Sequence, residues 1–223
     1  ADYMLVYSAY EQGRPNAVEL LKDYLDVYPA SRHADEVNFL IGSAHFGQGE
    51  YQKAIFWFNE SNIDMLSPEQ QEVYCFRLAY SLLQIGDMEK ARGYFARIEQ
   101  IGTKYREAST YYVAYIDYAT GKYNNALVEF TRLKDLPDYK ERSLYYITQI
   151  YFIQNKYEKV ISEGKELLAS YPDSENNSEV YRIMGNAYYH LGNEDQAINM
   201  LSKYVSSTDS PLRGDLYILG VCY

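Results

Sequence analysis

The residue types that most often carry enzyme chemistry are few in this chain and fall in no recognised catalytic pattern. The three histidines, His33, His45 and His190, are not spaced as metal ligands on a helix, and neither HExxH nor CxxC occurs. Gly47 and Gly49 form a GxG sequence that lacks the further glycine and the lysine of a phosphate-binding loop. No GxSxG nucleophile elbow is present, although a triad assembled from distant residues stays open. The sequence therefore predicts a protein that is not an enzyme and that holds no metal and no cofactor.

The composition is that of a folded, acidic protein. Of the 223 residues 47% are hydrophobic, and the formal net charge is -10. A negative charge disfavours nucleic acid as a partner, because the phosphate backbone calls for a basic surface. No apolar run reaches the roughly 20 residues of a membrane span. The two cysteines, Cys75 and Cys222, lie far apart in the sequence, and we expect both to be buried free thiols.

Several carboxylates fall where helices are expected to begin. Asp35 and Glu36 form one such cluster, and Glu69 and Glu72 form another. The helix dipole favours negative charge in a first turn, so we assign these residues to helix stability and not to acid–base chemistry.

Tyrosine is the one residue type whose abundance calls for a functional explanation. The chain contains 27 tyrosines. A tyrosine ring offers a large rigid contact surface with a polar tip, which is typical of binding surfaces. Whether these rings bind a ligand or fill the core depends on the elements that carry them.

One ten-residue pattern recurs along the whole chain. The clearest copies are GEYQKAIFWF (49–58), GDMEKARGYF (86–95) and GKYNNALVEF (121–130), and looser copies begin at Asn155 and Gly192. The small residue within each copy returns at intervals of 34–37 residues. A fixed period of this length indicates a stack of similar structural units.

The pattern has the spacing of a seam between two helices. The small residue of each copy and of the first unit is Ala17, Ala54, Ala91, Ala126, Val160 or Ala197. A second small position stands twelve residues earlier, at Gly42, Ala79, Ala114, Thr148 and Gly185. A large apolar residue follows four positions after the first, at Leu21, Phe58, Phe95, Phe130 and Leu201. Small residues at both points let two antiparallel helices approach closely, and a spacing of four keeps the large residue on the same face. The ten residues are therefore a turn and a packing seam.

The ends of the helices agree with this interpretation. Residues 67–70 (SPEQ) read as a capping box with proline in the first turn. The glycines at 49, 86, 121 and 192 mark the turn inside each helix pair. Sustained period-2 alternation, which would indicate strands, is absent from the sequence.

The units resemble the tetratricopeptide repeat. The best match joins Ile41 and Gly42 with the residues His45, Gly49, Tyr51, Ala54 and Phe58. The tryptophan usual early in the first helix is absent, and the fifth unit carries Thr148, Val160 and Gly164 at pattern positions. The resemblance implies an all-α, right-handed α-solenoid of about six helix-turn-helix repeats plus one extra C-terminal helix. Residues 1–223 would form a single solenoid domain, which we expect to be a fragment of a longer chain.

In the family that this chain resembles, first helices line a concave groove. The groove positions fall three before, one after and four after the small residue of the first helix. The resulting aromatic groove candidates are Phe39, Phe76, Tyr80, Tyr111, Tyr115, Tyr118, Tyr145, Phe152 and Tyr189. The alternative is that these rings form core between neighbouring first helices. A carboxylate clamp for peptide C-termini is disfavoured, since Arg182 and Asn186 match on one helix while the neighbouring helices do not.

The resemblance implies a non-enzymatic scaffold that binds a peptide or protein segment in the aromatic groove. A glycan-binding module and a regulatory segment of a longer enzyme are the alternatives. The apolar C-terminal stretch LYILGVCY (216–223) predicts self-association or further repeats. The linkers YPASRHADEV (28–37) and YPDSENNSEV (171–180) are similar to those of bacterial envelope repeat proteins, such as outer-membrane assembly lipoproteins and the Tol–Pal coordinator. This similarity favours a bacterial, exported protein, with a cytoplasmic location as the alternative.

Overall fold

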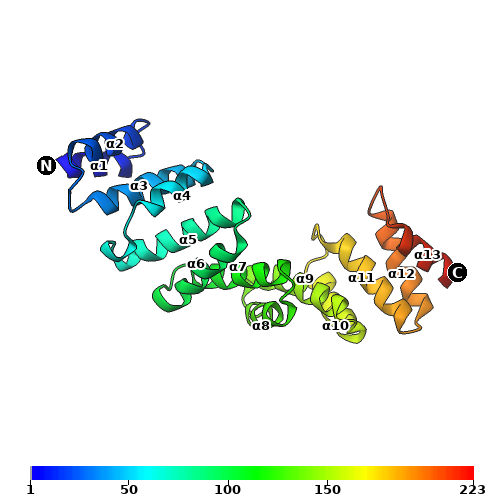
Figure 1. The fold of residues 1–223 in the computed structure, drawn as a ribbon. Coiled ribbons are helices and arrows are strands. Elements are labelled where there is room, and N and C mark those ends of the chain that lie inside the picture. Colours follow the sequence, from blue (N-terminus) through cyan, green and yellow to red (C-terminus); the bar gives the residue numbers. More distant parts are fainter. Residues whose placement is uncertain (1) are drawn as a thin grey trace. The chain divides into compact units, whose positions relative to one another are not determined.

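The computed structural model describes residues 2–223, and within that range all regular structure is helical (Figure 1). The helices are α1 (Asp2–Glu11), α2 (Ala17–Val27), α3 (Ala34–Gly47), α4 (Tyr51–Asn59), η1 (Ile63–Met65), α5 (Pro68–Gln84), α6 (Met88–Ile101), α7 (Arg106–Ala119), α8 (Tyr123–Leu133), α9 (Pro137–Ile153), α10 (Tyr157–Ser170), α11 (Asn177–His190), α12 (Glu194–Ser206) and α13 (Arg213–Cys222). This succession of helix pairs confirms the predicted α-solenoid fold class.

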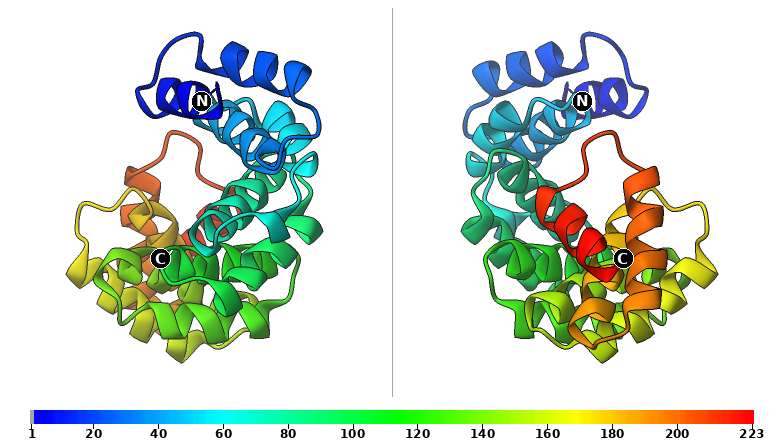
Figure 2. Two further views of the ribbon diagram at one scale, coloured as in Figure 1. Left: turned by 90° about the vertical axis from the view of Figure 1, so that its left-hand side faces the viewer. Right: turned by 90° about the vertical axis from the view of Figure 1, so that its right-hand side faces the viewer.

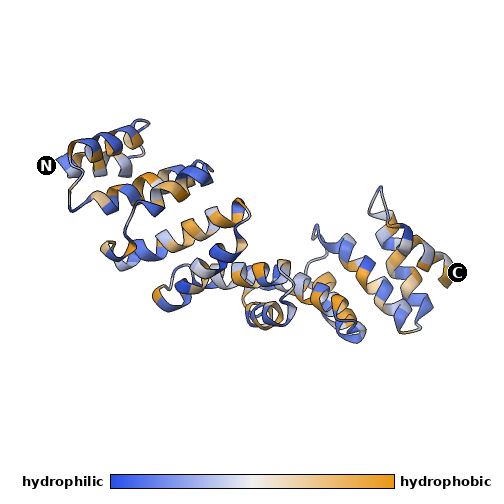
Figure 3. Ribbon diagram, in the orientation of Figure 1, coloured by the Kyte–Doolittle hydropathy of each residue, from blue (hydrophilic) through white to orange (hydrophobic). Residues whose placement is uncertain are grey.

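The chain divides into two compact units, Ala1–Val113 and Ala114–Tyr223, with the boundary inside α7. In unit 1, α1 packs on α2, α3 on α4, and α5 on α6. In unit 2, α9 packs on α10 and α11 on α12, while α13 lies against α11 and α12 (Figure 2). Hydrophobic and hydrophilic residues are interspersed along the helices (Figure 3), and the buried core residues of the helix pairs are mostly hydrophobic.

The turn inside each helix pair places one residue in the left-handed region. The residue has φ of 61° to 88° at Gly13, Gly49, Gly86, Gly121 and Gly192. A glycine adopts this conformation without the steric cost that a Cβ atom brings. In the fifth pair Asn155 takes the same role with φ of 57°, in keeping with the tolerance of asparagine for this region. The predicted turn glycines are confirmed.

The predicted seam is confirmed at atomic detail. A Cβ atom placed on Gly42 would lie 2.8 Å from the Phe58 ring, and one on Gly185 would lie 2.6 Å from Leu201 Cγ. Phe58 and Leu201 are each 0% exposed. The small residue of one helix therefore leaves the space that the large side chain of the partner helix fills.

The fifth helix pair keeps the seam despite its unusual residues. Thr148 and Val160 are fully buried, and the Thr148 hydroxyl donates a hydrogen bond to the Leu144 carbonyl at 2.7 Å. That bond removes the cost of burying the hydroxyl. Gly164 faces α11, since a Cβ atom there would lie 2.5 Å from the sulfur of Met184.

Hydrogen bonds connect carboxylates near the start of a first helix to the linker that leads into the next helix pair. Asp35 accepts a hydrogen bond from the backbone N–H of Asn62 at 2.7 Å. The buried carboxylate of Glu72 accepts one from the backbone N–H of Tyr105 at 2.6 Å, directly before α7. In unit 2, Glu141 accepts from the Ser174 hydroxyl at 2.5 Å. The assignment of Asp35 and Glu72 to the helix dipole alone was therefore incomplete, because these carboxylates also satisfy linker groups.

Candidate functional site

The structure separates the predicted groove residues into buried and accessible ones. Phe39 is only 5% exposed, and its ring lies 6.2 Å from that of Phe58. Phe39 is therefore a core residue. Its assignment to a ligand groove is corrected, because its ring packs beside Phe58 at the seam and is almost fully buried. The other eight candidates are partly exposed, namely Phe76, Tyr80, Tyr111, Tyr115, Tyr118, Tyr145, Phe152 and Tyr189.

In unit 1 the candidate rings of Phe76 and Tyr80 pack on aromatic rings of neighbouring helices and linkers. Phe76 stacks on Tyr105 with centroids 4.4 Å apart, and its edge meets Phe95 at 5.8 Å. Tyr80 lies edge-on to Phe46 at 5.8 Å. These rings thus contribute to packing between helices, and only part of each ring reaches the surface.

Two tyrosine doublets place neighbouring residues in different environments. Tyr112 stacks on Phe95 of the second helix, with centroids 4.9 Å apart and an angle of 16°. Tyr146 stacks on Phe130 in the same way, at 4.8 Å and 11°. The residue before each meets it edge-on, Tyr111 with Tyr112 at 5.4 Å and Tyr145 with Tyr146 at 5.3 Å. Sequence reasoning missed the seam role of Tyr112 and Tyr146, although the doublet itself is a signal, because consecutive helical residues point in directions about 100° apart.

In unit 2 three tyrosines gather around Tyr146. The centroid of the Tyr146 ring lies 5.0 Å from that of Tyr118, 5.3 Å from that of Tyr145 and 6.0 Å from that of Tyr115. Partial burial raises the pKa of Tyr118 and, to a smaller extent, so do the neighbouring Tyr145 and the carboxylate of Glu179. Burial also raises the pKa of Tyr145, again with help from Glu179. These hydroxyls therefore stay protonated and can donate hydrogen bonds at neutral pH.

A polar network connects the first helices α9, α11 and α13 beside these rings. Arg182 forms a two-pronged ion pair with Glu179, with Nε and Nη2 each 2.6 Å from a carboxylate oxygen. The Gln149 amide donates to Glu179 at 3.3 Å and so joins α9 to α11. On the other side, Arg182 Nη1 lies 3.8 Å from Asp215 of α13. We call Gln149, Glu179, Arg182, Asn186 and Asp215 the polar network.

The polar network explains why a carboxylate clamp is disfavoured. Arg182 is held by two carboxylates, and Glu179 raises the pKa of its guanidinium. The Asn186 amide donates to Asp215 at 2.7 Å and to the Arg182 carbonyl at 2.9 Å. The two residues that matched the clamp pattern are therefore already used within the fold.

We define the unit 2 face as the partly exposed side chains of the first helices beside this network. It comprises Tyr115, Tyr118, Tyr145, Phe152, Glu179, Arg182 and Tyr189. Arg182 lies over the Phe152 ring, 5.8 Å from its centroid. The face offers aromatic surface, tyrosine hydroxyls and one ion pair, which suit recognition of a ligand by contact.

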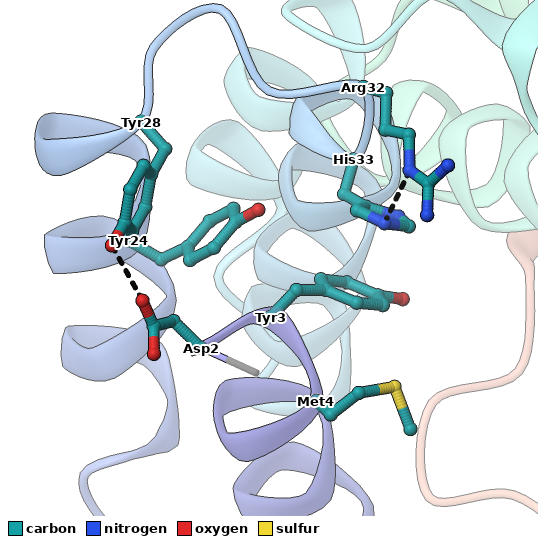
Figure 4. A pocket seen from close by; sticks show the side chains of 7 residues that line it. All are labelled: Asp2, Tyr3, Met4, Tyr24, Tyr28, Arg32 and His33. Atoms are coloured by element: carbon teal, nitrogen blue, oxygen red, sulfur yellow. Dashed lines mark hydrogen bonds between the residues drawn. The ribbon is translucent and has the colours of Figure 1, made fainter.

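A second candidate is a cavity of about 400 Å³ at the start of the chain (Figure 4). It is lined by Asp2, Tyr3, Met4, Tyr24, Tyr28, Arg32 and His33. Tyr3 stacks on His33 at 3.8 Å, and the Tyr28 hydroxyl donates to Asp2 at 2.6 Å. Arg32 Nε donates to His33 at 3.1 Å. These contacts join α1 and α2 to the linker before α3, so the side chains have a structural role.

The remaining chemistry-bearing residues are structural. Cys75 and Cys222 are buried free thiols, as predicted. His45 is 7% exposed, and its Nδ1 lies 2.6 Å from Glu50. Within residues 2–223 no three potential metal-ligating side chains come together. Nor is any helix in that range long and apolar enough to cross a membrane.

Comparison with known proteins gives one consistent result. A family model described as tetratricopeptide repeat matches residues 3–62, and a second of that description matches residues 74–100 and 179–207. Among solved structures, YrrB, described as a TPR protein with an unusual peptide-binding site, superposes with a TM-score of 0.67 at 11% identity, covering 92% of this chain and 97% of that one.

Two further structures agree. A tetratricopeptide repeat protein from Parabacteroides merdae has a TM-score of 0.61 at 16% identity, with 99% of this chain and 84% of that chain covered. The MamA protein has a TM-score of 0.64 at 16% identity, with 81% and 98% covered. No curated protein matches the sequence. At these identities the likeness concerns the fold alone.

Proposed function

Because the chain belongs to the tetratricopeptide-repeat family, we propose that it is a scaffold that binds a peptide or protein segment on its unit 2 face. Proteins of this family generally act as non-enzymatic scaffolds for protein or peptide partners. The finer assignment to the unit 2 face rests on this chain's own side chains.

The proposal rests on the different ring contacts of the two neighbouring residues Tyr145 and Tyr146. Tyr146 is used by the seam, where it stacks on Phe130. Tyr145 meets the Tyr146 ring edge-on with centroids 5.3 Å apart, and its own ring is partly exposed. A rigid, partly exposed tyrosine with a protonated hydroxyl is typical of interface hot spots. Tyr115, Tyr118 and Phe152 belong to the same face, and the proposal is supported by YrrB, a structure of the same fold described as having an unusual peptide-binding site.

The doublet also supplies a matched experiment. We expect Tyr145→Ala to weaken capture of the partner from source-cell extract while the midpoint of thermal unfolding changes little. Truncation of a tyrosine hot spot costs about 2 kcal/mol or more of binding free energy, which is roughly thirtyfold in affinity. Tyr146→Ala is expected to lower the midpoint of thermal unfolding, because it removes the stack on Phe130 and leaves a cavity. It should also weaken capture, since Tyr115, Tyr118 and Tyr145 pack against the Tyr146 ring, so only Tyr145→Ala separates binding from stability.

The double variant Tyr115→Ala, Tyr118→Ala extends the test to α7. We expect loss of capture with circular dichroism that stays helical. Capture that survives in both the Tyr145 variant and this double variant, with each protein shown to be folded, would move the site away from the unit 2 face. A glycan captured in a tyrosine-dependent manner in place of a protein would favour the glycan-binding alternative.

A further inference from the structure

The charges of the polar network do not cancel. Two carboxylates, Glu179 and Asp215, share the single guanidinium of Arg182. Glu179 takes both of its short contacts, while Asp215 sits at 3.8 Å and also accepts from Asn186. The network therefore carries one surplus negative charge.

The exposed fractions of the charged side chains determine which charge of the polar network a ligand could contact. The Asp215 side chain is 6% exposed, whereas the Glu179 side chain is 33% exposed. The Arg182 side chain, at 18%, has its donors turned to the two carboxylates. A ligand on the unit 2 face would thus encounter the carboxylate of Glu179 and not a free cation.

The aromatic rings beside Glu179 favour a positively charged ligand, as the Glu179 carboxylate does. Ring faces carry the negative end of a quadrupole and attract cations placed over them. Glu179 accepts a hydrogen bond from Gln149, which lies one helical turn after Tyr145 on α9. The charge of Glu179 also raises the pKa of both Tyr145 and Tyr118. Of the cations on α9, Lys140 is paired with Glu166 at 2.9 Å, and Arg142 lies one helical turn before Tyr145.

We infer that the unit 2 face binds its partner through a basic side chain, lysine or arginine, whose cation contacts the Glu179 carboxylate and the rings of Tyr118 and Tyr145. The inference rests on the proposed function and specifies the chemistry of its partner. An acidic segment or a free C-terminal carboxylate is disfavoured, because Arg182 and Asn186 are already engaged. Desolvation at the ring-lined face strengthens the attraction compared with a fully exposed ion pair.

The test uses the full chain and two synthetic peptides. The probes are peptides of about twelve residues that are identical except that one carries arginine where the other carries citrulline, which keeps the shape and removes the charge. Binding is followed by NMR titration at two salt concentrations. We expect the arginine peptide to bind about tenfold more tightly, with a preference that weakens only partly at high salt.

The variant Glu179→Gln keeps the hydrogen-bonding side chain and removes the charge. We expect it to bind both peptides with similar affinity. Glu158→Gln, on α10, makes the same change in net charge at an exposed site and should keep the arginine preference. This control separates the local carboxylate from the overall charge of -10.

The outcomes distinguish the inference from the proposed function. Equal binding of the two peptides by the wild-type protein, or an arginine preference that Glu158→Gln abolishes and Glu179→Gln does not, would overturn the inference. If binding is weakened by Tyr145→Ala but is independent of peptide charge, the inference fails and the proposed function stands. If Tyr145→Ala changes neither peptide's binding and partner capture also persists, both fail.

Discussion

Two glycine-to-alanine substitutions in unit 1 have different expected effects on stability, although both lie inside helices. Gly42 is in α3 at the seam, where an added methyl group would lie 2.8 Å from Cδ1 and 2.9 Å from Cε1 of Phe58. Gly93 is in α6, where an added methyl group meets nothing within 4 Å. The pair therefore measures the closeness of the seam.

The magnitude follows from two opposing terms. Replacing glycine by alanine in a helix interior stabilises it by about 1 kcal/mol, and this term is common to both sites. At Gly42 the methyl group must displace the Phe58 ring, which is fully buried with Phe39 at 6.2 Å and Tyr74 at 5.3 Å. Overpacking of that kind costs about 1–3 kcal/mol. We expect Gly93→Ala to stabilise unit 1 by about 0.5–1 kcal/mol and Gly42→Ala to be less stable than Gly93→Ala by about 1–3 kcal/mol.

The assay is urea unfolding followed by the fluorescence of Trp57. This is the single tryptophan of the chain, and it lies in α4 next to Phe58, so it reports on unit 1 even if the two units unfold separately. The comparison requires that both variants have the same m-value, the slope of the unfolding free energy against urea concentration. A shift of the unfolding midpoint then reports a difference in stability. A Gly42→Ala protein as stable as Gly93→Ala would refute the close approach of α3 and α4.

Three further predictions address the seam, the thiols and association. Ala126→Leu should destabilise unit 2 by roughly 1–3 kcal/mol in urea unfolding, since Ala126 is 0% exposed, and an unchanged unfolding midpoint would contradict the helix-pair seam. Burial raises the pKa of the Cys75 thiol to about 11, so we expect alkylation of Cys75 at neutral pH to occur only as unit 1 unfolds, and rapid labelling of the folded protein would refute this. We expect two copies to associate through α13, because Leu216 and Val221 are 42% and 51% exposed and Gly220 faces open space; a wild-type protein that sediments as a monomer at high concentration, like Val221→Glu, would contradict it.

The repeat architecture could be predicted from the sequence because each unit has the same local requirements at its seam and at its turn. The seam needs a small residue opposite a large one, and that need fixes the residue types at Gly42 and Phe58 wherever the unit recurs. The turn needs a left-handed residue, which only glycine or a residue such as Asn155 accepts easily. Side-chain and backbone requirements of this kind are visible within a window of a few residues.

The accessibility of the candidate site could not be predicted in the same way. Phe39 and Phe76 hold the same register on their helices, yet Phe39 is 5% exposed and Phe76 is partly exposed. Exposure is set by side chains from neighbouring elements, such as Tyr105 stacked on Phe76, and the register within one helix does not specify these.

The charged part of the site shows the same limit. The i, i+3 pair of Glu179 and Arg182 is readable from the sequence, since residues three apart share a helix face. Asp215 lies on a different helix, and nothing in the local pattern pairs it with Arg182. The surplus charge of the polar network therefore emerges only from the tertiary structure.

The most direct test of the unit 2 face as the binding site is photo-crosslinking from defined positions. A benzoylphenylalanine at position 145 keeps an aromatic ring on the face, and one at position 128 lies on the second helix α8, where Val128 is 65% exposed. We predict that illumination joins the bound partner segment to position 145 and not to position 128. Crosslinks from position 128 with none from position 145, in proteins that bind the partner equally well, would contradict the account.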